Sequence, residues 1–295
     1  MKLSYFRISS AALLAALAVA CSPVGQQPTP IPSSTAAADA TATRDDNLAL
    51  GNPSGAVADA TNSPNNYLLT KSQYTMSYSR DQGKPNWVSW HLSAAWLGST
   101  ARQDNFAADA TLPSGWYRAG STSYSGSGFD RGHNCPSADR TGSVADNSAT
   151  FLMSNMMPQA STNNQQTWAG LENYCRTLVN NGNELYIIAG SYGKGGTGTN
   201  GTASTIDSGR ITVPSNCWKV VVVLPVGTSD VSRITSSTRV IAINTPNTTS
   251  IGTSWGSYRT TVDAIENATG YNLLSAVSST IQSSIESKVD TGATN

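Results

Sequence analysis

The chain carries little charge. Asp, Glu, Lys and Arg make up 12% of its 295 residues, about half the share in an average globular protein. The 18 basic residues balance the 18 acidic ones. Proteins that package nucleic acid hold it with a strong net positive charge, so this chain is not of that class. A polyanion would have to bind here loosely, at a local cluster of arginines, which suits an enzyme that releases its product.

Histidine is also scarce. His91 and His133 are the only two in the chain. Imidazole is the side chain that most readily changes charge near neutral pH, so chemistry of that kind has two places at most. His91 has no acidic or basic neighbour in the sequence, and we interpret it as structural. His133 lies in a segment rich in charged side chains.

Cysteine is limited to four residues. Cys21 lies near the N-terminus, and Cys135, Cys175 and Cys217 are spread over the rest of the chain. Three cysteines allow at most one internal disulfide, which export from the cytoplasm would permit. The sequence does not select the pair.

Long apolar runs are absent, and the longest one points to export. Residues 11–20 are apolar but too few to span a bilayer, which takes roughly 20 residues. They follow Lys2 and Arg7, so residues 1–21 are predicted to be an export signal. The segment ends in A-V-A-C, which leaves two readings open: cleavage that frees a soluble protein, or a lipoprotein signal with a lipidated Cys21. Removing the signal would leave 16 basic and 18 acidic residues, a net charge of −2.

The next segment has too few large apolar residues to form a core. Residues 22–63 are rich in Pro, Ala, Ser and Thr, and we predict a disordered tether there. Residues 64–295, about 230 in number, suit one domain with a sizeable core.

Strand and helix patterns alternate along that domain. Strands are predicted where apolar residues alternate or where Val and Ile cluster, at residues 86–97, 184–189, 218–224 and 239–244. Residues 190–209 are rich in glycine and are predicted to form a long loop. Helices are predicted from apolar stripes at residues 168–180, 261–267 and 277–289. The predicted fold class is α+β, with a mostly antiparallel central sheet and helices on its faces.

Two motifs stand out in this domain. Residues 129–136 read F-D-R-G-H-N-C-P, which places a carboxylate, a fixed cation and an imidazole within four residues. Residues 164–172 contain N-x-x-x-W-x-x-L-E, and 31 positions separate His133 from Asn164. Either motif alone is only suggestive, but the two together are specific.

The two motifs resemble the signatures of the DNA/RNA non-specific endonucleases, the ββα-metal nucleases. The resemblance runs from about Tyr67 to the C-terminus and is nearest to the exported sugar-non-specific nucleases of cyanobacteria. It implies a hairpin followed by a crossing helix, the ββα-metal motif. It also implies Mg²⁺-dependent hydrolysis of single- and double-stranded DNA and RNA without sequence preference, leaving 5′-phosphate ends. Mn²⁺ is the expected substitute for Mg²⁺, the expected state is a monomer, and a dedicated inhibitor protein would be a further partner.

The resemblance assigns a role to each residue of the motifs. His133 would be the general base that deprotonates water, and Asn164 would be the direct protein ligand of Mg²⁺. Glu172 would support the water around the ion. Arg131 and Arg102 would stabilise negative charge on the phosphate, which the planar guanidinium binds well.

Two further residues are assigned to the substrate side. Arg176 would contact the substrate from the helix. Asp130 is placed with it, although we expect its main role to be support of the hairpin. Glu172 and Arg176 are also spaced i,i+4 and could simply form a solvated ion pair on the helix surface.

Two other interpretations were weighed. Residues 252–256 fit the G-x-S-x-G pattern of serine hydrolases, but both histidines precede Ser254, whereas that fold needs its histidine later in the chain. The non-enzymatic alternative is a surface lipoprotein that binds a cell-wall or extracellular polymer. It accounts for the predicted signal and tether but makes the two motifs a coincidence.

Overall fold

The computed structural model describes residues 41–295. The predicted export signal, residues 1–21, and residues 22–40 of the predicted tether lie outside the described residues. Residues 47–56 lie against the folded domain: Leu50 and Ala56 are each 2% exposed and belong to its core. The prediction that the tether extends to residue 63 is therefore wrong. A few apolar residues are enough to hold this segment on the domain, because the sheet provides the apolar surface against which they pack.

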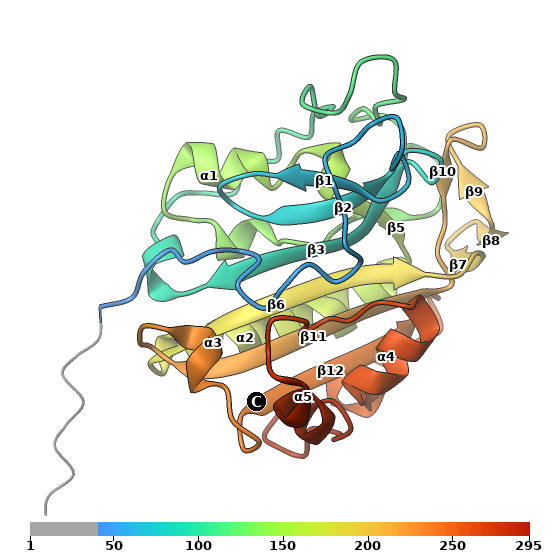
Figure 1. The fold of residues 1–295 in the computed structure, drawn as a ribbon. Coiled ribbons are helices and arrows are strands. Elements are labelled where there is room, and N and C mark those ends of the chain that lie inside the picture. The colour runs from blue at the N-terminus through green and yellow to red at the C-terminus, as the bar shows by residue number, and fades with distance from the viewer. Residues whose placement is uncertain (1–40) are drawn as a thin grey trace, which may run out of the picture. The chain divides into compact units, whose positions relative to one another are not determined.

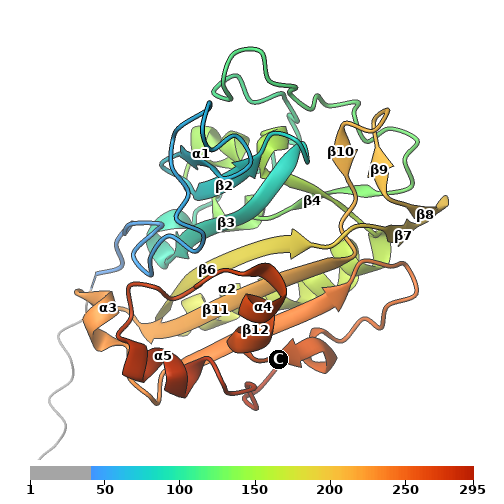
Figure 2. The same cartoon turned by 45° about the vertical axis from the view of Figure 1, so that its right-hand side comes forward.

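The domain is built on a seven-stranded sheet in which every neighbouring pair is antiparallel (Figures 1 and 2). In spatial order the strands are β1 (Tyr67–Thr70), β2 (Thr75–Ser79), β3 (Lys84–Leu92), β6 (Asn183–Tyr192), β11 (Asn216–Pro225), β12 (Arg239–Pro246) and β13 (Arg259–Thr260). The prediction of an α+β fold with a mostly antiparallel central sheet is confirmed.

Helices cover both faces of the sheet. One face packs against α2 (Ala169–Asn180), and the other packs against α4 (Val262–Thr269) and α5 (Ser279–Ile285). In Figure 1, α4 and α5 lie in front of the sheet and α2 lies behind it. Strand β11 shows the alternation: Trp218 and Val220 belong to the core under α4 and α5, whereas Cys217 and Val221 belong to the core under α2. Because both faces are buried, residues 220–224 of β11 form a continuous apolar run, V-V-V-V-L.

Shorter elements complete the domain. They are α1 (Val144–Ala149), α3 (Asp230–Arg233), β4 (Asp130–His133), β5 (Met156–Gln159), β7 (Gly196–Gly198), β8 (Gly201–Ala203), β9 (Thr205–Ile206) and β10 (Ile211–Thr212). None of the helices in residues 41–295 has the length and apolar character needed to cross a membrane.

Several predicted boundaries change in the structure. The glycine-rich segment 190–209 is not one long loop, because it contains the end of β6, the β7–β8 hairpin and β9. The last helix ends at Ile285, and Val289 lies beyond it with 47% of its surface exposed. Helix α4 runs two residues beyond its predicted end, to Thr269, and is capped by Gly270, whose φ of 76° is the left-handed conformation that glycine accepts easily.

The three cysteines within the described residues are free and buried. Burial raises the pKa of each thiol to about 12. The disulfide that the sequence allowed is therefore not formed among Cys135, Cys175 and Cys217.

Candidate active site

The first motif forms one strand of a hairpin. Strand β4 pairs antiparallel with β5, so that Asp130 lies opposite Gln159 and His133 lies opposite Met156. Gly132 allows this pairing, because a Cβ atom there would lie 2.3 Å from Oε1 of Gln159. Asp130, Arg131 and His133 are thus held on a short rigid strand.

The second motif begins with a π-helical turn, residues Asn163–Trp168, which continues into α2. The backbone N–H of Ala169 donates to the carbonyl of Asn164, five residues earlier. Asn164 and Glu172 then face one cavity of about 200 Å³, together with Arg102, Arg131 and His133. Such turns are uncommon in helices and are frequent at functional sites.

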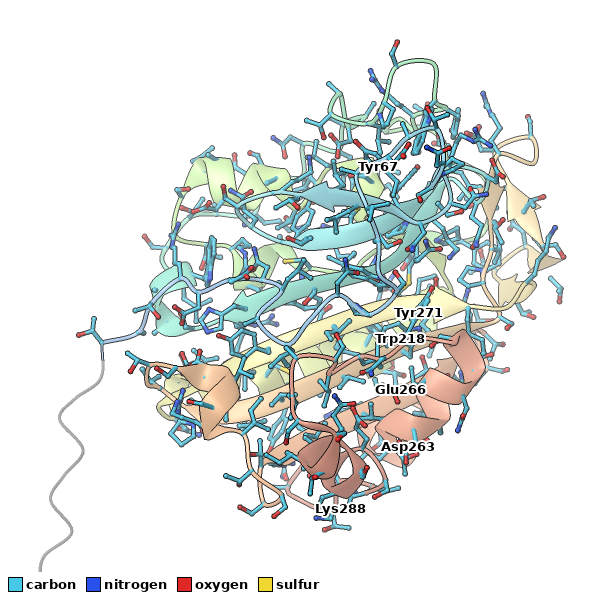
Figure 3. All side chains as sticks on the ribbon, in the orientation of Figure 1. Tyr67, Trp218, Asp263, Glu266, Tyr271 and Lys288 are labelled. Atoms are coloured by element: carbon cyan, nitrogen blue, oxygen red, sulfur yellow. The ribbon has the colours of Figure 1, made fainter. Side chains whose placement is uncertain are left out.

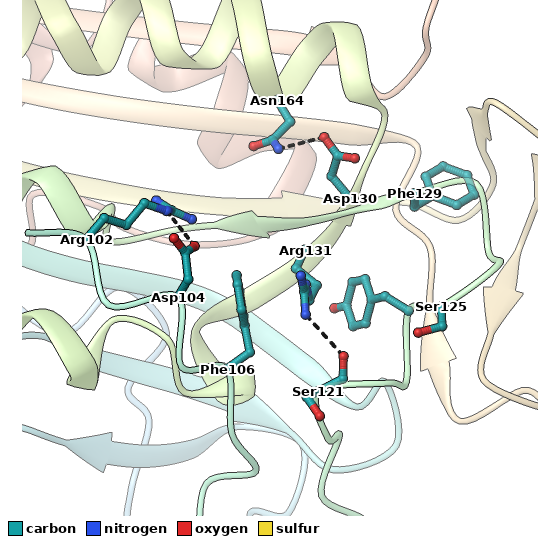
Figure 4. A pocket seen from close by; sticks show the side chains of 10 residues that line it. Arg102, Asp104, Phe106, Ser121, Ser125, Phe129, Asp130, Arg131 and Asn164 are labelled. Carbon is teal, nitrogen blue, oxygen red and sulfur yellow. Dashed lines mark hydrogen bonds and ion pairs between the residues drawn. The ribbon is translucent and has the colours of Figure 1, made fainter.

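A hydrogen bond between the two motifs fixes the amide of Asn164. Its Nδ2 donates to Oδ2 of Asp130 at 2.8 Å (Figure 4). Nε2 of the neighbouring Gln165 donates to the same oxygen at 2.8 Å. A carboxylate only accepts hydrogen bonds, so the NH₂ group of Asn164 must face Asp130. The Oδ1 atom is left without a hydrogen bond within residues 41–295 and is available to bind a ligand. Asp130 therefore orients Asn164 and also supports the hairpin.

His133 is enclosed by aromatic rings. Its imidazole lies edge-on to the rings of Phe106 and Phe151, at centroid distances of 5.7 and 5.0 Å. Its Nε2 atom is buried and has no hydrogen-bond partner within residues 41–295. Burial, together with the positive charges of Arg102 and Arg131, lowers the pKa of His133 to about 3. The imidazole is therefore neutral at physiological pH and able to accept a proton.

Two arginines lie above the same rings. The guanidinium of Arg131 lies 3.7 Å from the ring centroid of Phe106, and that of Arg102 lies 4.7 Å from that of Phe151. Arg131 also donates to the carbonyl of Ser121 at 3.2 Å. Both arginines line a second, more open cavity of about 380 Å³ that shares Asn164 with the first (Figure 4). Stacking on a ring holds each guanidinium in place while leaving N–H groups for an anion.

Glu172 and Arg176 do not pair with each other. Nζ of Lys219 lies 3.5 Å from Oε1 of Glu172, and Nη1 of Arg176 lies 2.7 Å from Oδ1 of Asp139. The i,i+4 pair suggested by their spacing is therefore wrong, because both side chains are bound by buried partners from other elements. Burial raises the pKa of Glu172, and Lys219 acts against this shift.

The seven predicted site residues thus fall into two groups. Asp130, Arg102, Arg131, His133, Asn164 and Glu172 come together around the two adjoining cavities. Arg176 stands apart: its guanidinium binds Asp139 and Asn173, and it lines neither cavity.

Sequence reasoning missed the aromatic support. The chain has four phenylalanines, and the three within residues 41–295, Phe106, Phe129 and Phe151, all lie at this site. Because phenylalanine is scarce in the sequence, these three positions could have been identified as candidates for the site. Lys219 gave none, since it lies inside an apolar strand and its partner Glu172 is 47 positions away.

The second histidine lies in a different network. Nδ1 of His91 accepts from the backbone N–H of Asp45 at 3.2 Å, and Nε2 lies 3.3 Å from Glu184. Asp45, His91, Glu184 and Asp230 lie close enough to hold a metal ion. However, Arg233 already supplies the positive charge, at 2.5 Å from Glu184 and 2.7 Å from Asp230. We interpret this group as a structural network.

Comparison with known proteins identifies the family of this chain. The DNA/RNA non-specific endonuclease family matches residues 52–280. A nuclease of Nostoc sp. (strain PCC 7120) is 50% identical over 279 residues, which are 95% of this chain and 96% of that protein. Nuclease C1 of Cunninghamella echinulata var. echinulata is 33% identical over 164 residues, 53% of this chain and 65% of that protein.

A solved structure shares the fold. The crystal structure of EndoG in complex with EndoGI covers 79% of this chain and 91% of its own, with a TM-score of 0.62 and 21% identity. The alternative of a non-catalytic polymer-binding lipoprotein is not supported, because the matches are to nucleases. The family match spans more than half of the chain and the Nostoc nuclease nearly all of it, so the chain belongs to the DNA/RNA non-specific endonuclease family and is a nuclease.

Proposed function

We propose that the protein is an exported, Mg²⁺-dependent endonuclease that cuts single- and double-stranded DNA and RNA without sequence preference. The observation that carries this proposal is the shared cavity of His133, Asn164 and Arg131. It combines a neutral imidazole, an amide oxygen held ready as a ligand and a guanidinium. In this proposal Asn164 binds the metal and Arg131 binds phosphate, and phosphate contacts position a nucleic acid without reading its sequence.

The residues at the cavity fit a hard divalent cation. Asp130 holds the NH₂ group of Asn164, which directs Oδ1 to act as a ligand, and Glu172 lies on the same cavity. Oxygen donors of this kind suit Mg²⁺, which keeps several waters and takes few protein ligands, and Mn²⁺ as its substitute. When bound, such an ion stabilises negative charge on the phosphate and assists the leaving alkoxide.

The side chains at the cavity have separate roles in the reaction. His133 takes a proton from the attacking water, and its surrounding rings keep competing solvent away. Arg131 and Arg102 bind phosphate oxygens and stabilise the charge that builds up on them. Lys219 and Arg176 position carboxylates: Lys219 binds the carboxylate of Glu172, and Arg176 binds that of Asp139.

Product analysis tests the proposed reaction. The protein is offered supercoiled plasmid, single-stranded DNA and RNA at equal nucleotide concentration, with Mg²⁺ and with EDTA. We expect all three to be cut with Mg²⁺ only, with 5′-phosphate ends, because the nucleophile is water and not a sugar hydroxyl. Cutting of RNA alone with 2′,3′-cyclic phosphate products would rule out this mechanism.

Replacing Asp130 tests the orientation of the metal ligand. In Asp130→Asn, the side chain at position 130 can present either its carbonyl or its NH₂ group to Asn164, so the direction of the Asn164 amide is no longer fixed. We expect the Mg²⁺ concentration for half-maximal rate to rise about 10–100-fold, the usual cost of losing a group that orients a ligand. Most of the rate should return at saturating Mg²⁺. An unchanged Mg²⁺ dependence would limit Asp130 to supporting the hairpin.

The pH dependence of the rate tests the state of His133. The base must be neutral, and the pKa of His133 is lowered to about 3, so protonation removes the base only as the pH falls toward 3. We therefore expect kcat/KM to stay flat from pH 8 to about pH 5, with no acid limb near 6.5, the ordinary value for histidine. Initial rates at saturating Mg²⁺ measure this. An acid limb centred near pH 6.5 would contradict the enclosed environment of His133.

Export is proposed from the N-terminal sequence alone. If Cys21 is lipidated, Cys21→Ser should move the protein from the membrane fraction to the soluble fraction, because the acyl anchor is lost. Activity per molecule should not change. Unchanged fractionation would favour a freely secreted or periplasmic form. We also propose that the protein is a monomer. A dedicated inhibitor protein is a further proposal, supported by the inhibition of EndoG in its complex with EndoGI.

A further inference from the structure

The face of the sheet opposite the active site carries a group of three carboxylates. Asp263 and Glu266 lie on α4 (Figure 3). Glu286 follows the last residue of α5. One oxygen of each carboxylate lies within 4.8 Å of the others. Three like charges at this distance repel one another unless a proton or a cation lies between them.

Glu286 points into this group without a partner. Its residue is only 4% exposed, and its Oε1 atom is buried without a hydrogen bond to any part of residues 41–295. Burying a carboxylate oxygen in this way is costly unless something binds it. The basic side chains nearby serve other acceptors: Arg239 and Arg259 bind Asp290, and Lys288 donates to the carbonyl of Ser236.

The geometry suits one class of ligand. Two oxygens on opposite sides of a Ca²⁺ ion are about 5 Å apart, since each Ca–O distance is about 2.5 Å. The span of 4.8 Å therefore allows all three carboxylates to contact one ion. There is no nitrogen or sulfur donor in the group, which favours a hard cation. Asp263 and Glu266 are only partly buried, which leaves room for the water ligands that Ca²⁺ also needs.

We propose that Asp263, Glu266 and Glu286 form a structural Ca²⁺ site that fastens the C-terminal helix to α4. The backbone already brings these elements together, because the N–H of Asp263 donates to the carbonyl of Glu286 at 3.2 Å. Helices α4 and α5 both bury apolar side chains in the core on this face, through Val262, Ile265 and Ile285. A bound Ca²⁺ ion turns the repulsion between the carboxylates into a cross-link between the two helices.

Thermal unfolding of the full chain tests the site. The melting temperature, Tm, is measured with EDTA, with CaCl₂ and with KCl at matched ionic strength, for the native chain and for Glu286→Gln. At a hundredfold excess of Ca²⁺ over its Kd, we expect the Tm of the native chain to rise by about 5 °C or more. In Glu286→Gln the rise should vanish, and the Tm in EDTA should equal or exceed the native value, since one repelling charge is gone.

Two further variants complete the test. Asp263→Asn, at a more exposed position, should lose the Ca²⁺ response in the same way even if Glu286→Gln folds poorly. Asp81→Asn also removes one carboxylate but lies in an exposed ion pair with Arg80, and it should keep the native response. Cleavage of plasmid with Mg²⁺ below the Tm should be native in all three variants, which separates this site from the active site.

Two results would overturn the proposal. The first is a Ca²⁺-dependent rise in Tm that survives in both Glu286→Gln and Asp263→Asn. The second is a native chain that responds to Ca²⁺ no more than to KCl and becomes more stable as the pH falls from 8 to 6. Burial and the two neighbouring carboxylates raise the pKa of Glu286 to about 7, so this second result would mean that a proton joins the three carboxylates.

Discussion

His133→Ala is expected to lower kcat by about 10²–10⁴-fold, the usual cost of losing a general base. The imidazole is neutral, lies beside Arg131 and Asn164 in one cavity, and has no second histidine near it to take over. The protein should still fold, because the ring makes edge contacts with Phe106 and Phe151 but its Nε2 holds no hydrogen bond within residues 41–295. Plasmid nicking and circular dichroism, measured on the same preparation, separate the two effects.

The other histidine provides the control. In His91→Gln, the contacts with Asp45 and Glu184 in the core are disturbed, so stability should fall while kcat per folded molecule remains native. Imidazole added to His133→Ala should restore part of the rate, since the enclosed space can accept a free ring. Near-native activity in His133→Ala would refute the assignment of the base.

Asn164→Ala is expected to have the second large effect. It removes the amide oxygen that Asp130 holds ready for the metal, and the loss of several kcal/mol of charge stabilisation corresponds to about 100-fold or more in rate. Higher Mg²⁺ concentration should restore little of the rate. In this respect the variant differs from Asp130→Asn, in which the ligand atom is still present.

The next residue is a close control for Asn164. Gln165 donates to the same oxygen of Asp130 at the same distance of 2.8 Å, but it is exposed and lines neither cavity. Gln165→Ala should therefore stay within a few-fold of the native rate. Equal losses in the two variants would mean that the hydrogen bonds to Asp130 matter and the oxygen of Asn164 does not. Metal binding kept in Asn164→Ala but lost in His133→Ala would reverse the two roles.

The sequence was sufficient for the main elements of the fold where a periodic pattern was strong. The Val-rich strand β11 and the apolar stripe of α2 lie where they were predicted. The short strands β1 and β2 were missed because they are only four and five residues long. β2 does alternate, with Met76 and Tyr78 between Thr and Ser, but over too few residues to stand out. Residues 47–56 were assigned to the tether by composition, which does not show that a small apolar residue such as Ala56 can cover part of a sheet.

The site was predicted as a set of residues but not as an arrangement. The two motifs identified His133 and Asn164, and the structure brings them to one cavity. What each side chain contacts depends on residues far along the chain, such as Lys219 for Glu172 and Asp139 for Arg176. The pKa of His133 likewise depends on Phe106 and Phe151 as well as on the motif, since burial is its main cause. The spacing of residues within the two motifs does not show these contacts with distant residues.

The π-helical turn determines which side chains of this segment lie on the same face. In an α-helix each residue rotates the side-chain direction by about 100°, so the eight steps from Asn164 to Glu172 would leave them about 80° out of line. The wider turn at Asn163–Trp168 absorbs the difference, and both side chains reach the same cavity. A regular α-helix over the same residues would therefore turn Asn164 away from Glu172, whereas deleting one residue of the turn would leave seven α-helical steps, about 20° short of two full turns, and could keep the two side chains on one face. The shared cavity thus depends on the π-helical geometry of this segment and not on its length alone.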